Sequence, residues 1–198
     1  MTKKKKKRWA DHYTVKAKKE NYPARSIYKL QEIQKKYNII KRGGRVLDLG
    51  FAPGSWLLYA AHSTGEDGSV IGIDIKDTDI VLPNNAKVIK ADIFEYQDNE
   101  LFADNRFDVV LSDMAPDTTG NSFVDSARSL NLAEAAFLIA KKTLAPKGSF
   151  VCKIFFGEDF KAFTDKVKGY FKEFKIFKPK TCRKQSKEIY IVGKDRSI

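Results

Sequence analysis

The sequence predicts an α/β fold of the doubly wound, Rossmann-like type, with a seven-stranded, mostly parallel sheet that contains one antiparallel strand. Short apolar runs rich in β-branched and aromatic residues alternate with helical patterns, which is typical of a parallel sheet covered on both faces. Glycine or aspartate follows several of these runs. The last two runs lie too close together in the chain for a parallel crossover. The chain has 198 residues, 42% of them hydrophobic, so we expect residues 9–198 to form a single domain with its own core.

The N-terminal segment precedes the alternating pattern and is expected to be a basic tail followed by two helices. Residues 1–8 are predicted to be a disordered tail. A weak helix from about Trp9 to Glu20 should end before Pro23, because proline lacks an amide donor and disfavours helix in the residue before it. Ser26 is then expected to cap a second helix that runs to about Tyr37.

Five central apolar runs are predicted to be buried strands, and three stretches between or after them to be helices. The strands are Val46–Leu49, Val70–Ile73, Lys87–Ile89, Phe107–Leu111 and Phe150–Phe155. The helices are Trp56–His62, Asp125–Thr143 and Asp159–Phe171. The second helix has the clearest signals, since Asp125 can cap its start and Lys141 and Lys142 suit its C-terminal end.

The last two apolar runs are predicted to pair as an antiparallel hairpin. Phe174–Phe177 and Ile189–Val192 are separated by only about eleven residues, including Pro179. A parallel crossover needs roughly a dozen or more residues and usually a helix. We therefore expect one antiparallel strand from about residue 188 to 193.

The charge is distributed unevenly along the chain. Residues 1–45 hold 16 Lys or Arg against 3 Asp or Glu, residues 46–160 hold 9 against 18, and residues 161–198 hold 12 against 4. These differences of +13, −9 and +8 sum to the net charge of +12. Basic segments of this size favour a polyanionic partner, nucleic acid before an anionic membrane surface. A solvated basic tail and lysine-rich face would give the same composition.

The first strand runs into a glycine turn that is expected to approach a nucleotide-like ligand. Gly50 and Gly54 flank this turn, and Pro53 lies inside it. The spacing differs from the G-x-G-x-x-G fingerprint of dinucleotide-binding proteins, and no Gly-Lys-Ser/Thr follows as in a Walker loop. A pyrophosphate site is therefore disfavoured.

Four aspartates lie at or near the carboxyl ends of consecutive predicted strands: Asp48, Asp74, Asp92 and Asp113. The carboxyl edge of a parallel sheet is where ligands bind, and a carboxylate after the second strand suits the ribose hydroxyls of an adenosine. An acidic pocket favours a cofactor that carries adenosine and positive charge, so S-adenosylmethionine fits and NAD does not. One such aspartate alone would more often be a turn or helix cap. The expected cofactor residues are Asp48, Gly50, Pro53, Gly54, Asp74, Asp92 and Asp113.

Six stretches, in a fixed order along the chain, carry a resemblance to a known family. They are Tyr22–Leu30, Asp48–Trp56, Ser112–Pro116, Leu144–Phe150, Cys152–Glu158 and Ser186–Val192. From about Trp9 to Lys194 the chain resembles the FtsJ/RrmJ-type ribose 2′-O-methyltransferases of RNA. Phe51 and Ser55 depart from the usual Ala and Gly of this family, and Asp117 from its usual Asn.

The resemblance implies a catalytic tetrad, a cofactor and an RNA substrate. The Lys-Asp-Lys-Glu tetrad of the family maps onto Lys29, Asp113, Lys153 and Glu188, with Lys153 as the general base, and Trp56 joins the cofactor residues. The implied activity is 2′-O-methylation of a ribose in RNA with S-adenosylmethionine, on a uridine of 23S-type large-subunit rRNA. The implied partner is the large ribosomal subunit or its rRNA, held by helices within residues 9–40. We expect a cytoplasmic monomer with no membrane partner.

Four alternatives remain at this point. Related small members of the family act on tRNA anticodon loops. A nucleotide-dependent oxidoreductase would need the absent dinucleotide fingerprint, and a non-catalytic RNA-binding module would not need the intact tetrad. A base methyltransferase would need an Asn/Asp-Pro-Pro-Tyr/Phe loop or a cysteine after the fourth strand, where this chain has Asp113-Met114-Ala115-Pro116. With two isolated cysteines and two histidines, no metal site is expected.

Overall fold

A computed structural model gives the architecture of residues 12–96, 107–183 and 185–197. It contains one seven-stranded sheet in the order β3-β2-β1-β4-β5-β7-β6. The strands are β1 (Arg45–Leu49), β2 (Ser69–Asp74), β3 (Ala86–Lys90), β4 (Phe107–Ser112), β5 (Leu144–Phe155), β6 (Phe171–Phe177) and β7 (Glu188–Arg196). The described helices are α1 (His12–Lys19), α2 (Ile27–Tyr37), α3 (Ser55–Thr64), α4 (Ile93–Tyr96), α6 (Ser122–Thr143) and α7 (Phe160–Lys168). The predicted basic tail, residues 1–8, lies outside the described residues.

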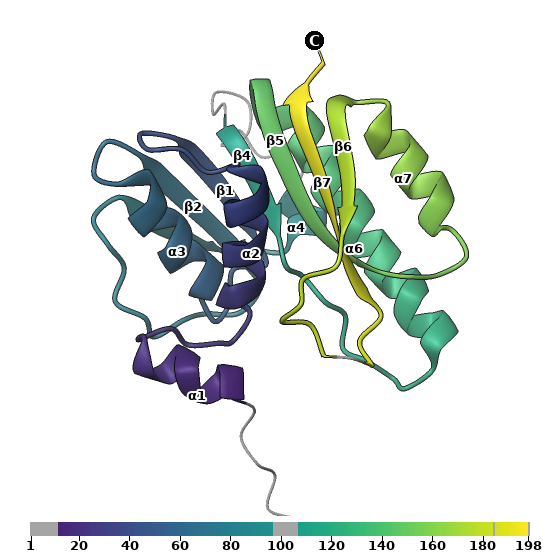
Figure 1. Cartoon of the computed structure of the whole chain (residues 1–198), viewed down its shortest axis with the longest axis horizontal. Helices are drawn as coiled ribbons and strands as arrows, with labels where there is room; N and C mark the ends of the chain where they lie inside the picture. The colour runs from purple at the N-terminus through teal and green to yellow at the C-terminus, as the bar shows by residue number, and fades with distance from the viewer. Residues whose placement is uncertain (1–11, 97–106, 184, 198) are drawn as a thin grey trace, which may run out of the picture.

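The strand pairing confirms the predicted sheet. Strands β1 to β5 pair in parallel, and β7 runs antiparallel to both of its neighbours, β5 and β6. β7 is thus inserted between two strands that precede it in the chain (Figure 1). The insertion makes β5 an internal strand, which matters because β5 carries Lys153.

Two apolar layers enclose the sheet, as a doubly wound fold requires. On one face, Leu30 of α2 and Trp56 of α3 pack with apolar residues of β1, β2 and β5, namely Val46, Val70 and Val151. On the other face, α6 and α7 cover Phe107, Phe150 and neighbouring side chains. Figure 1 shows α2 and α3 on the near side of the sheet and α1 at its foot, below the loops that leave the carboxyl ends of the strands.

Two predicted helix caps are wrong. The side chain of Ser26 makes no capping hydrogen bond, although α2 does begin directly after it. α6 begins three residues before Asp125, because Asn121 accepts hydrogen bonds from the amides of Phe123 and Val124. Asp125 instead lies inside the first turns of α6, where its carboxylate accepts from the amide and hydroxyl of Thr119 and the amide of Gly120.

Several predicted element bounds also need correction. β5 begins at Leu144 rather than near Phe150, because Leu144 pairs with Phe107 before an irregularity in the ladder. β6 begins at Phe171, which the sequence assigned to the end of the preceding helix. α7 ends at Lys168, and Gly169 and Tyr170 form the turn between the helix and the strand. The helix predicted over residues 9–20 is present as α1 within the described residues.

Candidate active site

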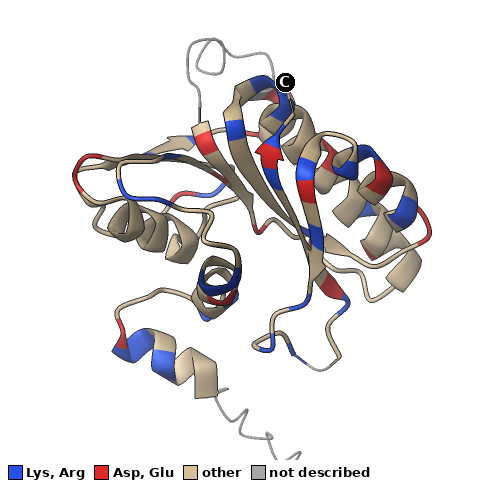
Figure 2. Cartoon of the chain, turned by 45° about the horizontal axis from the view of Figure 1, so that its top comes forward, with Lys and Arg blue, Asp and Glu red and all other residues tan. Residues whose placement is uncertain are grey.

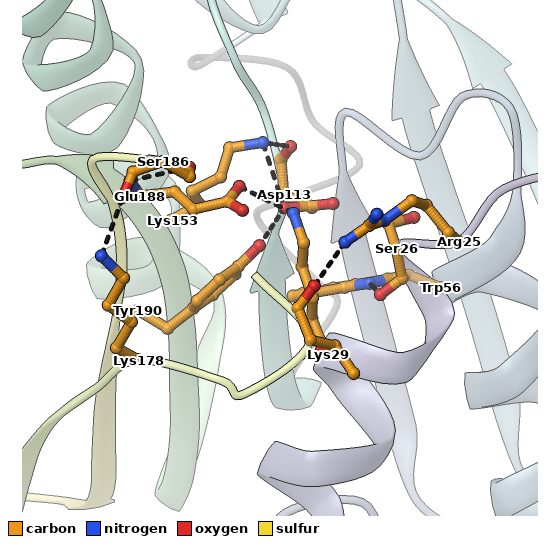
Figure 3. A network of polar contacts seen from close by, with 11 residues as sticks. Arg25, Ser26, Lys29, Trp56, Asp113, Lys153, Lys178, Ser186, Glu188 and Tyr190 are labelled. Atoms are coloured by element: carbon orange, nitrogen blue, oxygen red, sulfur yellow. Dashed lines mark hydrogen bonds and ion pairs between the residues drawn. The ribbon is translucent and has the colours of Figure 1, made fainter. Parts of the chain in front are cut away.

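Side chains from four separate elements meet at the carboxyl edge of the sheet. Lys29 comes from α2, Asp113 follows β4, Lys153 lies near the end of β5, and Glu188 begins β7. Figure 3 shows these four side chains converging, with Tyr190 of β7 among them. The structure therefore brings together all four residues of the predicted tetrad.

Lys153, Asp113 and Tyr190 form one hydrogen-bonded group. The Nζ atom of Lys153 lies 3.1 Å from Oδ1 of Asp113 and also donates to the carbonyl oxygen of Asp113. The hydroxyl of Tyr190 donates to the same Oδ1 atom at 2.6 Å. Strand register explains the meeting, because Lys153 and Tyr190 are direct cross-strand partners and so share a face of the sheet. Lys153 is only 7% exposed, so its amine is held in one position rather than solvated.

Lys29 and Glu188 form a second, adjacent pair. Nζ of Lys29 donates to Oε2 of Glu188 at 2.7 Å, and both side chains are largely buried. Burial alone would raise the pKa of Glu188, but the Lys29 ammonium, with help from a contact with the Cys182 thiol and from the charge of Lys153, lowers it below its usual value. Glu188 is therefore an anion at neutral pH, and the pair adds no net charge to the site.

Tyr190 is a site residue that the sequence reasoning missed. It is fully buried, stacks in a tilted arrangement on Trp56 at 5.8 Å, and lies two residues after Glu188 on the same face of β7. Burial first, then the charges of Asp113 and Glu188, raises the pKa of its hydroxyl well above the usual value, so it remains a hydrogen-bond donor. Its position two residues after the predicted Glu188 was the available signal, since alternate residues of a strand share a face.

The segment that carries Lys29 is fixed at two places. The indole Nε1 of Trp56 donates to the carbonyl of Ser26 at 2.9 Å, which joins the start of α2 to α3. On the other side, Glu32 accepts the amides of Lys180 and Thr181 at 2.8 and 2.9 Å, and Arg25 donates to the carbonyl of Thr181. The loop between β6 and β7 is thereby tied to α2 just before it delivers Glu188.

A cavity of about 320 Å³ lies beside the tetrad, and Asp113 borders both. This volume is at the lower end of the range of small-ligand sites. Its lining combines carboxylates with apolar side chains: Gly50, Ala52, Ile73, Asp74, Ile75, Lys76, Ala91, Asp92, Ile93, Phe94, Asp113, Met114, Ala115 and Leu132. Four of the predicted cofactor residues therefore line one cavity, namely Gly50, Asp74, Asp92 and Asp113.

Asp74 and Asp92 also shape the local backbone. The carboxylate of Asp74 accepts the amide of Ala52 at 2.9 Å and that of Lys76 at 2.8 Å, which holds the glycine turn against the end of β2. The carboxylate of Asp92 accepts the amide of Phe94 at 2.9 Å at the start of α4. Asp74 and Asp92 thus act as ordinary turn and helix caps, and both also line the cavity.

Asp48 lies in the middle of the sheet with no exposed surface and no hydrogen-bond partner for either carboxylate oxygen. Burial is the main reason that its pKa is raised well above the usual value, and the nearby charges of Asp113 and Asp74 act in the same direction. A buried carboxylate without partners is costly. A cation placed against this group of carboxylates would offset that cost.

The glycine turn leaves no room for side chains at two positions. Gly50 has a φ of 74°, and a Cβ atom there would come within 2.1 Å of Cγ of Met114. Gly54 has a φ of 112°, and a Cβ atom there would meet Cδ1 of Ile80 at 2.2 Å. The structure does not bring Gly54, Pro53, Trp56 or Asp48 to the cavity wall: Gly54 is covered by Ile80, and Trp56 and Asp48 are buried in the interior.

The donor set of the cavity fits S-adenosylmethionine. The acidic wall formed by Asp74, Asp92 and Asp113, with the buried Asp48 close to two of them, favours a ligand with sulfonium and ammonium charge and would repel the phosphates of a dinucleotide. Apolar residues such as Ile93 and Phe94 offer contacts for an adenine ring. Among the described residues, no three His, Cys, Asp or Glu side chains are grouped to hold a metal ion.

Comparison with known proteins identifies relatives over nearly the whole length of the chain. The FtsJ-like methyltransferase family model matches residues 22–196. The sequence is 56% identical over 193 residues to the ribosomal RNA large subunit methyltransferase E of Desulforapulum autotrophicum, covering 97% of this chain and 95% of that protein. It is 55% identical to the protein of the same name from Desulfosudis oleivorans, covering 92% and 89%. The crystal structure of a ribosomal RNA methyltransferase from Plasmodium falciparum aligns with a TM-score of 0.77 at 28% identity, covering 88% of this chain and 98% of that one.

Proposed function

Because this chain belongs to the FtsJ-like methyltransferase family, we propose that it methylates a ribose 2′-hydroxyl of large-subunit ribosomal RNA with S-adenosylmethionine, using Lys153 as the general base. The observation that supports the base most directly is the burial of Lys153 beside Asp113 and Tyr190, next to the acidic cavity. An enzyme that transfers a methyl group to a ribose oxygen needs both a base for the hydroxyl proton and a site for the donor, and these lie side by side here.

The cofactor residues would divide the ligand between them. Asp74 and Asp92 would accept hydrogen bonds from the adenosine, while Asp48 and Asp113 would favour the positively charged methionine end. Gly50 and Gly54 would keep the turn close to the ligand, with Pro53 and Trp56 supporting the turn from behind. When bound, S-adenosylmethionine supplies an electrophilic methyl group on a sulfonium.

The tetrad would prepare the ribose hydroxyl for attack. Lys153 would accept the proton of the 2′-hydroxyl, so that the ribose oxygen could take the methyl group that the bound donor would supply. Asp113, held by the Tyr190 hydroxyl, would orient the Lys153 amine. Lys29 and Glu188, as a neutral pair, would flank the ribose and fix its position without adding net charge.

The RNA would reach this site across the basic surface formed by α1, α2 and the loop between β6 and β7. Figure 2 shows lysine and arginine residues on each of these elements near the foot of the molecule. We propose that the helices within residues 9–40 hold the RNA backbone and that the acceptor is a uridine of 23S-type rRNA in the large subunit. We further propose that the enzyme acts as a cytoplasmic monomer. No described helix is long and apolar enough to cross a membrane.

Labelling of RNA tests this function. Tritiated S-adenosylmethionine is incubated with the protein and with total RNA, large ribosomal subunits or tRNA, and the labelled nucleotide is mapped. We expect label on a ribose 2′-oxygen of a large-subunit uridine. Label on a base, on tRNA alone, or on no RNA would contradict the proposal.

The Lys153→Ala variant tests the base. Loss of a general base slows transfer by about 10²- to 10⁴-fold, while S-adenosylmethionine affinity, measured by calorimetry, should stay within about twofold. The matched control is Lys175→Ala, which removes an exposed lysine from the edge strand β6 and should leave the rate unchanged. Full activity in Lys153→Ala would exclude Lys153 as the base.

A further inference from the structure

Two phenylalanine side chains stand exposed on the side of the carboxyl edge that faces away from α2. Phe123 in the first turn of α6 is 65% exposed, and Phe156, directly after β5, is 59% exposed. Neither ring belongs to the core clusters that hold the sheet and its helices together. Large exposed aromatic side chains next to a reaction site call for a binding explanation.

Backbone and side-chain contacts join these two positions into one surface. The amide of Phe156 donates to the carbonyl of Lys187 at 3.1 Å, and Nζ of Lys187 donates to the hydroxyl of Ser122. The adjoining amide of Phe155 donates to the hydroxyl of Ser129 at 3.0 Å, which fixes the end of β5 to α6. We call Ser122, Phe123, Phe156 and Lys187 the aromatic patch.

The aromatic patch lies close to Lys153. Phe156 is three residues beyond Lys153 on the same chain segment, a separation of at most about 10 Å. α2 lies on the opposite face of the sheet, and α1 lies at the foot of the sheet (Figure 1). An RNA strand that passes from α2 over Lys153 therefore arrives at Phe156 and Phe123.

We propose that the aromatic patch binds an unpaired nucleobase of the RNA strand next to the methylated ribose, by stacking on Phe156 and Phe123. This inference rests on the proposed function and extends it to a second contact with the substrate. Sequence-specific and single-strand RNA recognition commonly places splayed bases on aromatic rings. Lys187 and the N-terminal end of α6 offer the positive charge for the adjoining phosphate.

The charges around the patch favour a base over other occupants. Glu158 and Asp159, shortly after Phe156, are exposed and would repel a phosphate on that side, whereas Lys187 on the other side would attract it. The area that two phenyl rings can bury is also far smaller than the roughly 800 Å² that each partner buries in a stable protein–protein interface. Phe156 is supported from below by Phe160, whose ring centroid lies 5.3 Å away, which leaves its outer face for a single base.

The test measures RNA binding and base stacking independently of methyl transfer. Affinity for large-subunit rRNA is measured by filter binding for the wild type, Phe156→Ala, Phe123→Ala and the double variant. Stacking is measured as quenching of 2-aminopurine in a single-stranded RNA oligonucleotide. We expect each alanine variant to bind RNA about 5- to 50-fold more weakly and the double variant to lose the quenching, while Phe156→Tyr keeps both.

Leu138→Ala is the matched control, because it removes an exposed apolar side chain near the other end of α6 and should change neither measurement. Unchanged rRNA affinity and quenching in the double variant would overturn the proposal. If the variants bound ribosomal subunits more weakly but free rRNA equally well, the patch would contact a ribosomal protein, and the proposal would be overturned as well. Failure of the proposed function would appear differently, as absence of methyl transfer by the wild type.

Discussion

At the scale of single residues, the site combines polar side chains that have hydrogen-bond partners with one buried carboxylate that has none. Most polar groups of the site have partners: Lys29 donates to Glu188, and both Lys153 and Tyr190 contact the carboxylate of Asp113. Asp48 has no partner and lies among other carboxylates. The sequence identified Asp48 by its place at the end of a strand, but the absence of partners depends on packing between β2 and β4, which sequence patterns do not reveal.

The Asp48→Asn variant should be more stable than the wild type and bind the cofactor more weakly. Because the folded-state pKa of Asp48 is raised, its ionisation opposes folding at neutral pH and has no such effect below the usual pKa of about 3.8. A neutral amide removes this cost, on the order of 1 kcal/mol, or a rise in Tm of roughly 2–4 °C at pH 7. S-adenosylmethionine affinity should fall at least several-fold.

Calorimetric melting from pH 7 down to pH 3.5 checks this, since the gain in Tm should shrink as the pH falls. The control is Asp108→Asn, which changes a surface aspartate of β4 whose carboxylate accepts the amide of Arg45. An Asp48→Asn protein that is less stable at pH 7 would contradict the account.

The Glu188→Gln variant should lose stability at neutral pH by an amount that disappears in acid. The folded-state pKa of Glu188 is lowered, so the pair with Lys29 stabilises the protein above the usual pKa of about 4.5 and this stability is lost as the pH falls through the lower folded value. The Tm difference from the wild type should be greatest between pH 5 and 7 and should narrow below pH 4.5. Glu134→Gln, which breaks an exposed pair with Lys166, should show a small difference at every pH.

At the scale of elements, the connections between helices, strands and loops were harder to predict than the elements themselves. Strand and helix positions follow from apolar periodicity, so every predicted strand is present. The start of α6 was wrong because both Asn121 and Asp125 suit a cap, and only the geometry shows that Asn121 caps the helix while Asp125 organises the loop before it. The tie between Glu32 and the loop before β7 joins residues too far apart in sequence for any local pattern.

Glu32→Ala should loosen that loop and reduce methyl transfer without reducing cofactor binding. Glu32 accepts the amides of Lys180 and Thr181, so its removal frees the segment that delivers Glu188 to Lys29. We expect faster hydrogen exchange at residues 178–187 and a rate of transfer lower by about tenfold. Glu32→Gln should keep exchange slower and transfer faster than Glu32→Ala does, because its amide oxygen still accepts hydrogen bonds from the loop amides. Unchanged exchange in Glu32→Ala would show that the loop is held by other contacts.

At the scale of the whole molecule, the uneven charge of the sequence becomes a division in space. The acidic central segment supplies the strand ends around the cavity, and the basic segments supply α1, α2 and the loop that leads to β7 (Figure 2). The sequence predicted this division because charged residues that are close in the chain stay close in the folded protein. The tetrad, by contrast, was predicted only through the resemblance to a family. Neither route predicted Tyr190 or the aromatic patch, which depend on strand register and on exposure.

RNA binding should weaken steeply with salt, and cofactor binding should not. Each lysine or arginine that neutralises a phosphate releases a counterion, so log K falls linearly with log salt in proportion to the number of contacts. Filter binding at 50–300 mM salt, together with cofactor calorimetry over the same range, measures the two slopes. Removal of residues 1–8 should reduce the RNA slope alone. Equal slopes for both ligands would argue against an electrostatic RNA surface.

The insertion of β7 between β5 and β6 also sets an order of events during synthesis. Lys29, Asp113 and Lys153 leave the ribosome first, and Glu188 and Tyr190 follow them on β7. Since domains are made from the N-terminus, β5 remains an unpaired edge until that strand arrives. A nascent chain therefore holds its future base without the groups that position it until β7 has been made.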